Sequence, residues 1–341
     1  MEIVGFFDLH RQQITFDYVD RVSGEVQRGR LRPATRASLR TWLERFDGRP
    51  AEFGVEGCTG WRFVTEELAR VAITAHLAEP AELAARRGPK RRAKTDWADA
   101  RRGREALERG ELPESWIPPE HLLEIRSLCR LYADLMSDRN GWQQRIHATC
   151  FHQGVPPIGR DVLTADHRAA VETAALSRAG RHSVDVALAM VDQLDQRLEP
   201  LRATLQTHGR RQTGCRALQG HYGIAELTAT IIWAELGDCR RFHSSDQAVR
   251  HTGLDVTVHD SDGHRTRGHL SRQGPPLLRW ALFEAAKCAA RTTSPDHAYY
   301  RTVHAREGAG RATLSVARKL VRRCHHTLVA LGDAALEPAR P

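Results

Sequence analysis

Residues 86–100 read RRGPKRRAKTDWADA and are the most informative segment of the chain. Between positions 86 and 104 nine Lys or Arg residues accompany two Asp residues, which gives a local charge of +7. The two acids, Asp96 and Asp99, are three residues apart, so a helix would place both carboxylates on one face. A helix is predicted because Thr95 is a suitable N-cap, good helix formers follow, and Gly110 can end it.

Two neighbouring carboxylates repel each other unless a cation lies between them. Mg²⁺ prefers oxygen ligands and often binds through one or two carboxylates together with phosphate and water. Acids within a basic run therefore suggest a metal-dependent phosphodiester site, in which flanking cations hold a polyanion. The candidate phosphate-binding residues are Arg87, Lys90, Arg91, Arg92 and Lys94. The alternative is that both acids only complement the helix dipole.

Composition bounds the class of protein. The length of 341 residues favours two domains, or three. The net charge of +9 and the pI near 9.6 favour a nucleic-acid partner over acidic small molecules. The alternative is that the chain is only a soluble basic protein. The seven Cys residues form no Cys-x-x-Cys pair, so we expect a reduced, cytoplasmic compartment and no structural zinc. We expect no membrane span and no signal peptide, because no long apolar run occurs.

The first part of the chain predicts an α/β domain over residues 1–110. Runs of apolar residues predict a meander of three strands, followed by a helix, a strand, a second helix and a further strand before the basic run. The strands are expected at 2–8, 13–19, 25–31, 52–56 and 72–78, and the helices at 34–46 and 61–70.

Two of these strands end in an acid, Asp8 and Glu56. Ligand sites in α/β sheets lie near the carboxyl ends of strands. Together with Asp96 and Asp99, these residues make four carboxylates that could converge on one cation. Each also has a structural interpretation, Asp8 as the cap of a turn and Glu56 as a surface acid.

The Pro-rich residues 111–119 predict a linker, and long helices follow it. Helices are expected at 120–151 and 183–208, with a short one near 167–176 between them. Their apolar residues repeat at steps of three and four, which is typical of a coiled coil, so residues 120–210 are predicted to form a helical arm. Pro200 could kink the second helix or begin a new one. The two helices could pack as an ordinary core or serve self-association.

Residues 211–335 are predicted to be mainly helical. Helices are expected over 220–236, from Ser244 or Ser245 through 251, and over 275–290 and 311–331. Residues 253–274 differ, because they are polar, rich in Gly and basic, and predict a loop or hairpin that presents Ser261, Arg265, Arg267 and Arg272. A serine among arginines could attack phosphorus if a base or metal activates it. It could also be an ordinary turn serine, since no triad is evident.

Taken in order, these segments resemble the DEDD-type transposases of bacterial insertion sequences, the IS-one-ten family. The resemblance covers nearly the whole chain. The segments that carry it are Phe-Asp8, Val-Glu56-Gly-x-Thr-Gly, Lys94-Thr-Asp96-x-x-Asp99-Ala, and Gly253-Leu-Asp…Ser261-Asp-Gly…Gly268-His-Leu-Ser-Arg-Gln-Gly274.

The resemblance implies a RuvC-like, RNase-H-type N-terminal domain whose four acids bind Mg²⁺ or Mn²⁺. It implies a coiled-coil arm and a C-terminal transposase domain, in which Ser261 would be the nucleophile that becomes joined to DNA. It also implies donor and target DNA as partners, a structured guide RNA encoded by the element, and a homo-oligomer, either a dimer or a tetramer.

Three functions remain open at the level of sequence. The first is a transposase or recombinase that joins DNA covalently to Ser261. The second is a Mg²⁺-dependent, structure-selective nuclease of the Holliday-junction type, with water as the nucleophile. The third is a basic nucleic-acid-binding protein without catalysis. The four acids at the expected positions argue against this third function.

Overall fold

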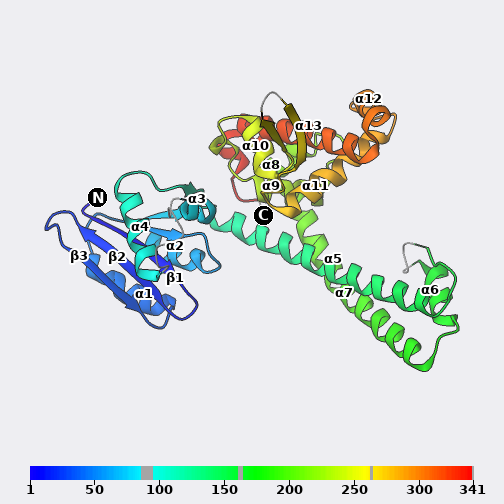
Figure 1. Cartoon of the computed structure of the whole chain (residues 1–341), viewed down its shortest axis with the longest axis horizontal. Coiled ribbons are helices and arrows are strands. Elements are labelled where there is room, and N and C mark those ends of the chain that lie inside the picture. Colours follow the sequence, from blue (N-terminus) through cyan, green and yellow to red (C-terminus); the bar gives the residue numbers. More distant parts are fainter. Residues whose placement is uncertain (86–94, 160–163, 262–263, 340–341) are drawn as a thin grey trace. The chain divides into compact units, whose positions relative to one another are not determined.

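The computed structural model describes residues 1–85, 95–159, 164–261 and 264–339, and within the hairpin it describes only the backbone for residues 258–261 and 264–267. The chain forms two compact units, Met1–Ile117 and Pro118–Pro341 (Figure 1).

The N-terminal unit is built on a six-stranded mixed sheet of order β3-β2-β1-β4-β5-β6. The first three strands are antiparallel, β4 and β5 continue the sheet parallel to β1, and β6 is antiparallel to β5. The strands are β1 Ile3–Leu9, β2 Ile14–Asp20, β3 Val26–Leu31, β4 Ala51–Glu56, β5 Thr74–Ala78 and β6 Glu114–Ser115.

Helices cover both faces of this sheet. On one face, the residues of α1 (Arg36–Leu43) and α2 (Trp61–Arg70) bury an aromatic and aliphatic core against alternate residues of the strands, among them Phe7 and Phe53. On the other face, α4 (Asp96–Glu108) packs on the remaining alternate residues, including Phe6. Successive side chains of each central strand therefore point alternately into the two cores on opposite faces of the sheet. Short elements complete the unit: η1 Glu44–Phe46 and α3 Pro80–Ala85.

The predicted α/β order is confirmed for this unit, with differences at the margins. The helix expected at 34–46 is divided into α1 and η1. The strand expected at 72–78 is β5, which begins at Thr74. Ala72 has a positive φ of 56° and belongs to the preceding turn. The short α3 and the two-residue β6 were not predicted, since neither is long enough to show a hydrophobic period.

The second unit begins with two long helices, α5 (Glu120–His152) and α7 (Arg178–Arg211), which pack along each other (Figure 1). The shorter α6 (Ala165–Thr173) lies between them in the chain. The two predicted long helices are thus confirmed. Pro200 does not begin a new helix, because α7 runs continuously through it.

The rest of this unit is a helical bundle with one hairpin, and α9 (Glu226–Leu236) lies at its centre. Every residue from Ala229 to Leu236 is buried, and the Trp233 indole donates a hydrogen bond to the Ala335 carbonyl over 2.7 Å. The surrounding elements are α8 Thr213–Leu218, η2 Cys239–Arg241, α10 Ser245–Thr252, β7 Val256–Ser261, β8 His264–Leu270, α11 Pro276–Lys287, η3 Cys288–Ala290, α12 His297–Glu307, α13 Ala309–Leu331 and η4 Gly332–Ala335.

The mainly helical character of this unit and its hairpin at 253–274 are confirmed, whereas α12 was not predicted because only Val303 on it is buried. No helix within the described residues is both long and apolar enough to span a bilayer.

Candidate metal centre and serine hairpin

The parallel pairing of β1 and β4 brings the first two acids to one edge of the sheet. Phe7 lies opposite Val55 in the register, so Asp8 and Glu56 are the next residues along two neighbouring strands that run in the same direction. Both lie on the face that α4 covers, since Phe6 and Gly54, two positions earlier, face that helix. The side chain of Asp8 is largely buried, with 10% exposed.

Helix α4 brings the other two acids over the same edge. Thr95 is its N-cap and accepts a hydrogen bond from the Ala98 amide over 3.2 Å, as expected. Asp96, Asp99 and Gly103 follow at helical spacing on one face. A Cβ at Gly103 would lie 2.4 Å from the Phe6 ring, so this glycine allows the helix to lie directly on β1. The first turn of α4 is thereby held beside the end of β1.

Asp8 and Asp96 meet around a third side chain, His10. His10 Nε2 lies 3.2 Å from Asp8 Oδ2 and 3.3 Å from Asp96 Oδ1. One ligand atom from each of these three residues can be chosen so that all lie within 4.8 Å of one another. Gln13 donates from Nε2 to Asp96 Oδ2 over 2.9 Å, and Asp99 is paired with Arg102.

The electrostatics of this cluster favour a cation. Burial raises the pKa of Asp8, His10 lowers it, and the neighbouring carboxylates of Asp96 and Asp99 raise it further. Carboxylates that destabilise one another's charge in this way are stabilised by a divalent ion. Oxygen donors of this kind suit Mg²⁺ and Mn²⁺, so the residues present fit such an ion.

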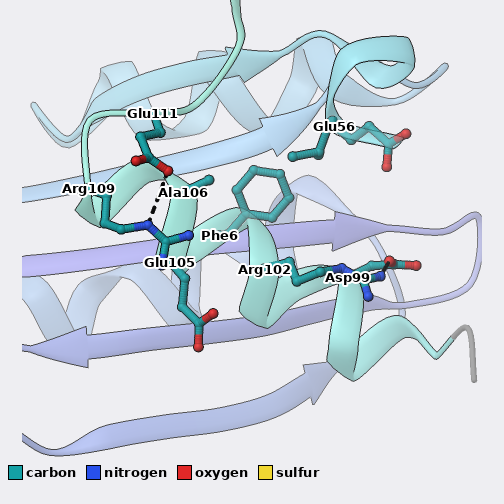
Figure 2. A pocket seen from close by; sticks show the side chains of 9 residues that line it. Phe6, Glu56, Asp99, Arg102, Glu105, Ala106, Arg109 and Glu111 are labelled. Atoms are coloured by element: carbon teal, nitrogen blue, oxygen red, sulfur yellow. Dashed lines mark hydrogen bonds and ion pairs between the residues drawn. The ribbon is translucent and has the colours of Figure 1, made fainter. Parts of the chain in front are cut away.

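A cavity of about 690 Å³ adjoins the cluster, and Glu56 and Asp99 both line it. Figure 2 shows their side chains at the same end of the cavity, beyond the Phe6 ring, whereas Arg109 and Glu111 lie at the other end. At that end the Arg102 guanidinium lies beside Asp99, so both acids and one cation of the lining are near the carboxyl ends of β1 and β4.

The fold thus brings the four predicted carboxylates to one region of the N-terminal unit, Asp8 and Asp96 most closely. Sequence reasoning missed His10 and Gln13. No periodic signal marked His10, because β1 ends at Leu9 and His10 belongs to the turn that follows. No local signal marked Gln13, whose partner is 83 residues away.

In the second unit, β7 and β8 form an antiparallel hairpin. Ser261 is the last residue of β7 and pairs with His264, Asp260 pairs with Arg265, and Val258 pairs with Arg267. The side chains of Ser261, Arg265 and Arg267 lie outside the described part. Arg272, just after the hairpin, is exposed and has a positive φ of 53°.

The root of this hairpin is held by several contacts. The hydroxyl of Ser271 donates to the carboxylate of Asp255, and Arg318 Nε donates to the Leu254 carbonyl over 2.6 Å. Arg279 Nη1 donates to the Gly274 carbonyl over 2.7 Å and to the Thr252 carbonyl over 3.2 Å. These hydrogen bonds hold the residues on both sides of the hairpin that carries Ser261.

The predicted basic residues before α4 fall in residues 86–94, which lie outside the described residues. They are Arg87, Lys90, Arg91, Arg92 and Lys94. Their proposed contacts with phosphate stay a prediction.

Two curated proteins are similar to part of the chain. A "Probable family 20 transposase" of Pseudomonas aeruginosa is 26% identical over 133 residues, which cover 38% of this chain and 39% of that protein. A "Transposase for insertion sequence element IS1111A" of Coxiella burnetii is 26% identical over 129 residues, 37% of this chain and 35% of that protein. In both cases the similar segment spans less than two fifths of the relative's length.

A family model matches within the second unit. Residues 215–301 match the family described as Transposase IS116/IS110/IS902, and this range contains the whole hairpin with Ser261 and Arg272. The matched range begins in α8 and ends in α12. The helical unit that holds the serine hairpin is thus similar to insertion-sequence transposases of the IS116/IS110/IS902 family.

Proposed function

We propose that the chain is an insertion-sequence transposase that cuts and rejoins DNA, with four carboxylates that bind a divalent cation and with Ser261 as the nucleophile. The observation that carries the proposal is the meeting of Asp8, Asp96 and Asp99 at the end of β1, in a chain whose other unit resembles transposases.

The sheet order supports the RuvC-like, RNase-H-type interpretation of the N-terminal unit. Three antiparallel strands followed by two parallel ones place Asp8 at the centre of the sheet, with Glu56 on the adjacent strand. An acid on each of these strands and two on a helix above them gather four carboxylates at one edge of the sheet. Such an edge suits a cation that approaches together with the phosphates of DNA.

In this proposal Asp8, Glu56, Asp96 and Asp99 hold Mg²⁺ or Mn²⁺, which when bound would polarise a scissile phosphate. Ser261 Oγ forms a bond to phosphorus as the bond from phosphorus to a DNA oxygen breaks. The serine proton is lost, and the displaced DNA oxygen leaves as a hydroxyl after taking up a proton. The new phosphoester conserves bond energy for strand rejoining, and Arg265, Arg267 and Arg272 offset the charge that develops on phosphate.

We further propose DNA ends of donor and target as substrates, a structured guide RNA as partner, a homo-oligomer as the active form, and the cytoplasm as the location. The net charge of +9 supports a polyanionic partner. The long paired helices α5 and α7 offer an extended arm for self-association.

A second function keeps the metal site but not the serine chemistry. It is a structure-selective nuclease with water as the nucleophile, and the buried Asp8 and the cavity that Glu56 and Asp99 line would serve it equally well.

Trapping separates the two functions. The protein is mixed with RNA from the flank of its element, labelled junction DNA and Mg²⁺, and a denaturing gel is run to detect a protein–DNA adduct. The transposase predicts an adduct that Ser261→Ala abolishes and that Ser183→Ala, which changes an exposed serine of α7, leaves intact. DNA cleavage without an adduct would instead establish the nuclease. If Asp8→Asn cleaved normally, the metal role of the carboxylates would be wrong.

A further inference from the structure

His10 lies between two carboxylates of the proposed metal site, although its own side chain is half exposed. Its Nε2 atom is 3.2 Å from Asp8 Oδ2 and 3.3 Å from Asp96 Oδ1, and 52% of the side chain is exposed. The Nε2 atom thus faces two acids that come from different parts of the chain, one at the end of β1 and one in the first turn of α4. The imidazole is therefore placed to share whatever those acids bind.

The backbone fixes this placement. Strand β1 ends at Leu9, and the His10 amide donates to the Gln13 carbonyl over 2.9 Å, which closes a tight turn into β2. The same turn presents the Gln13 amide to Asp96. One short segment thus holds both the imidazole and the carboxylate of Asp96 against the end of β1.

A relay of hydrogen bonds extends this arrangement to a cationic side chain. Arg32 donates to Gln13 Oε1 from Nε over 3.0 Å and from Nη2 over 2.6 Å, while Gln13 donates to Asp96. The guanidinium fixes which end of the Gln13 amide faces the carboxylate. Asp96 consequently keeps one oxygen bound to Gln13 and turns the other toward His10. Partners of this kind orient ligands in metal sites.

We propose that His10 supplies a nitrogen ligand to the cation of this site and makes the site prefer a first-row transition ion such as Mn²⁺ over Mg²⁺. The inference rests on the proposed function, because it concerns the same carboxylates. Mg²⁺ binds oxygen donors almost exclusively, whereas imidazole binds transition ions well, and their affinities for nitrogen sites exceed that of Mg²⁺. A site with two carboxylates and one imidazole should therefore bind Mn²⁺ more tightly than Mg²⁺. A site with four carboxylates alone should bind the two ions with more similar affinities.

Binding of each metal ion alone to the full chain tests the proposal without any catalytic assay. Isothermal titration calorimetry would compare Mn²⁺ and Mg²⁺ with the wild type and His10→Gln. We expect the variant to lose about tenfold or more in Mn²⁺ affinity, as ligand-shell changes do. Its Mg²⁺ affinity should stay within about twofold, because oxygen donors dominate that ion.

The chain offers a matched control, His76, which also lies between two carboxylates of the same unit. Its Nδ1 is 2.9 Å from Glu114 Oε1 and its Nε2 is 3.3 Å from Glu52 Oε2, on strands β5, β6 and β4. His76→Gln should leave both metal affinities unchanged. A loss of Mn²⁺ affinity in His76→Gln equal to that in His10→Gln would overturn the proposal.

Spectroscopy gives a readout that does not depend on a variant. Electron spin-echo envelope modulation of bound Mn²⁺ should show a directly coordinated nitrogen in the wild type, and His10→Gln should lack it. Mn²⁺ that binds without nitrogen coupling would overturn the role of His10 and leave the proposed function standing. Failure of either ion to bind, or binding that Asp8→Asn leaves unchanged, would overturn the metal site itself.

Discussion

The amide of Gln13 donates a hydrogen bond to the carboxylate of Asp96 over 2.9 Å, between residues that are 83 positions apart. This bond ties the turn after β1 to the first turn of α4, the two places from which the candidate metal ligands come. The geometry of the site therefore depends on a residue that is not itself a ligand.

Replacing Gln13 tests this dependence. Gln13→Ala should lower the affinity for Mg²⁺ by about tenfold, because Asp96 loses the partner that orients it. Calorimetric titration of the ion into the full chain measures the change. Gln27→Ala is the matched control, since Gln27 bonds Tyr18 and Glu25, neither of which is a candidate metal ligand. Equal affinities in the wild type and Gln13→Ala would show that α4 alone fixes Asp96.

Replacing a helical glycine by alanine should lower the stability of the chain at Gly103 and raise it at Gly141. At Gly103 a Cβ would meet the Phe6 ring at 2.4 Å, so Gly103→Ala must push α4 away from β1 and cost about 1–3 kcal/mol. The same shift moves Asp99 and Asp96 from Asp8 and should weaken binding of the divalent ion. At Gly141 of α5 the nearest atom is 3.9 Å away, so Gly141→Ala should stabilise the chain by about 0.5–1 kcal/mol.

Urea unfolding followed by circular dichroism measures both effects. The close packing of α4 on β1 would be contradicted if Gly103→Ala were as stable as the wild type and bound Mg²⁺ with the same affinity. A loss of stability in Gly141→Ala would show instead that the added methyl group clashes with neighbouring atoms.

The order of elements in the N-terminal unit was predictable because each strand carries a run of apolar residues bounded by turn residues. Asp8 and Glu56 could be predicted as neighbours because both end buried strands, and Asp96 and Asp99 because helical spacing gives them one face. The contacts of His10 and Gln13 could not be predicted in the same way. They depend on the packing of α4 against β1, which is set by Gly103 on Phe6 and leaves no periodic signal in the turn itself.

The second unit was less predictable in detail for a similar reason. The long helices α5 and α7 have an apolar stripe, whereas α12 buries only Val303 and shows none. The hairpin was recognisable from its glycines and polar residues. Its fixed base was not, because Arg318 and Leu254 meet only in the folded chain.

A buried ion pair beneath α4 should control the stability of the N-terminal unit. The carboxylate of Asp17 is fully buried and accepts hydrogen bonds from Arg104 Nε at 2.5 Å and from Arg28 Nε at 2.6 Å. Arg104→Ala leaves this charge with one partner, so we expect a loss of about 3 kcal/mol in the free energy of unfolding.

Arg101→Ala provides the comparison for that measurement. Arg101 lies on the same helix but pairs at the surface with Glu105, where solvent screens the interaction, so its loss should be much smaller. If the two variants unfolded at the same urea concentration, burial of Asp17 would not be a source of stability.

The second unit should lose stability as the pH falls. Burial, reinforced by the neighbouring Arg241, lowers the pKa of His251 to about 4 from its usual 6.5. The unfolded chain therefore binds a proton more readily than the folded chain between these values, so stability present above pH 6.5 is lost progressively toward pH 4. A pKa difference of this size corresponds to roughly 3 kcal/mol of unfolding free energy once the pH has fallen below both values.

Urea midpoints at pH 7.5 and pH 5.0 measure this loss, and His251→Gln should make the two midpoints more nearly equal. His208, whose pKa burial also lowers to about 4, contributes in the same direction and remains in that variant. An unchanged difference between the midpoints in His251→Gln would show that other groups cause the acid sensitivity.

The contact between Arg318 and Leu254 should affect chemistry at the hairpin without affecting metal binding. Arg318 Nε donates to the Leu254 carbonyl at the residue where the chain enters the hairpin, and Leu254 itself is buried. Arg318→Gln should loosen the base of the strands and misplace Ser261, which would lower the yield of protein–DNA adduct by about tenfold or more. The affinity for Mg²⁺ should stay unchanged, since every candidate ligand belongs to the other unit.

Arg322→Gln is the control for this variant. Arg322 lies one turn further along α13 and pairs at the surface with Asp246, 2.9 Å from its Nε, so its loss should leave the adduct yield intact. A parallel loss of adduct and of Mg²⁺ affinity in Arg318→Gln would indicate general unfolding rather than a displaced hairpin. An unchanged adduct yield in a folded Arg318→Gln protein would mean that the other contacts at the root, those of Arg279 and Ser271, are sufficient to position the serine.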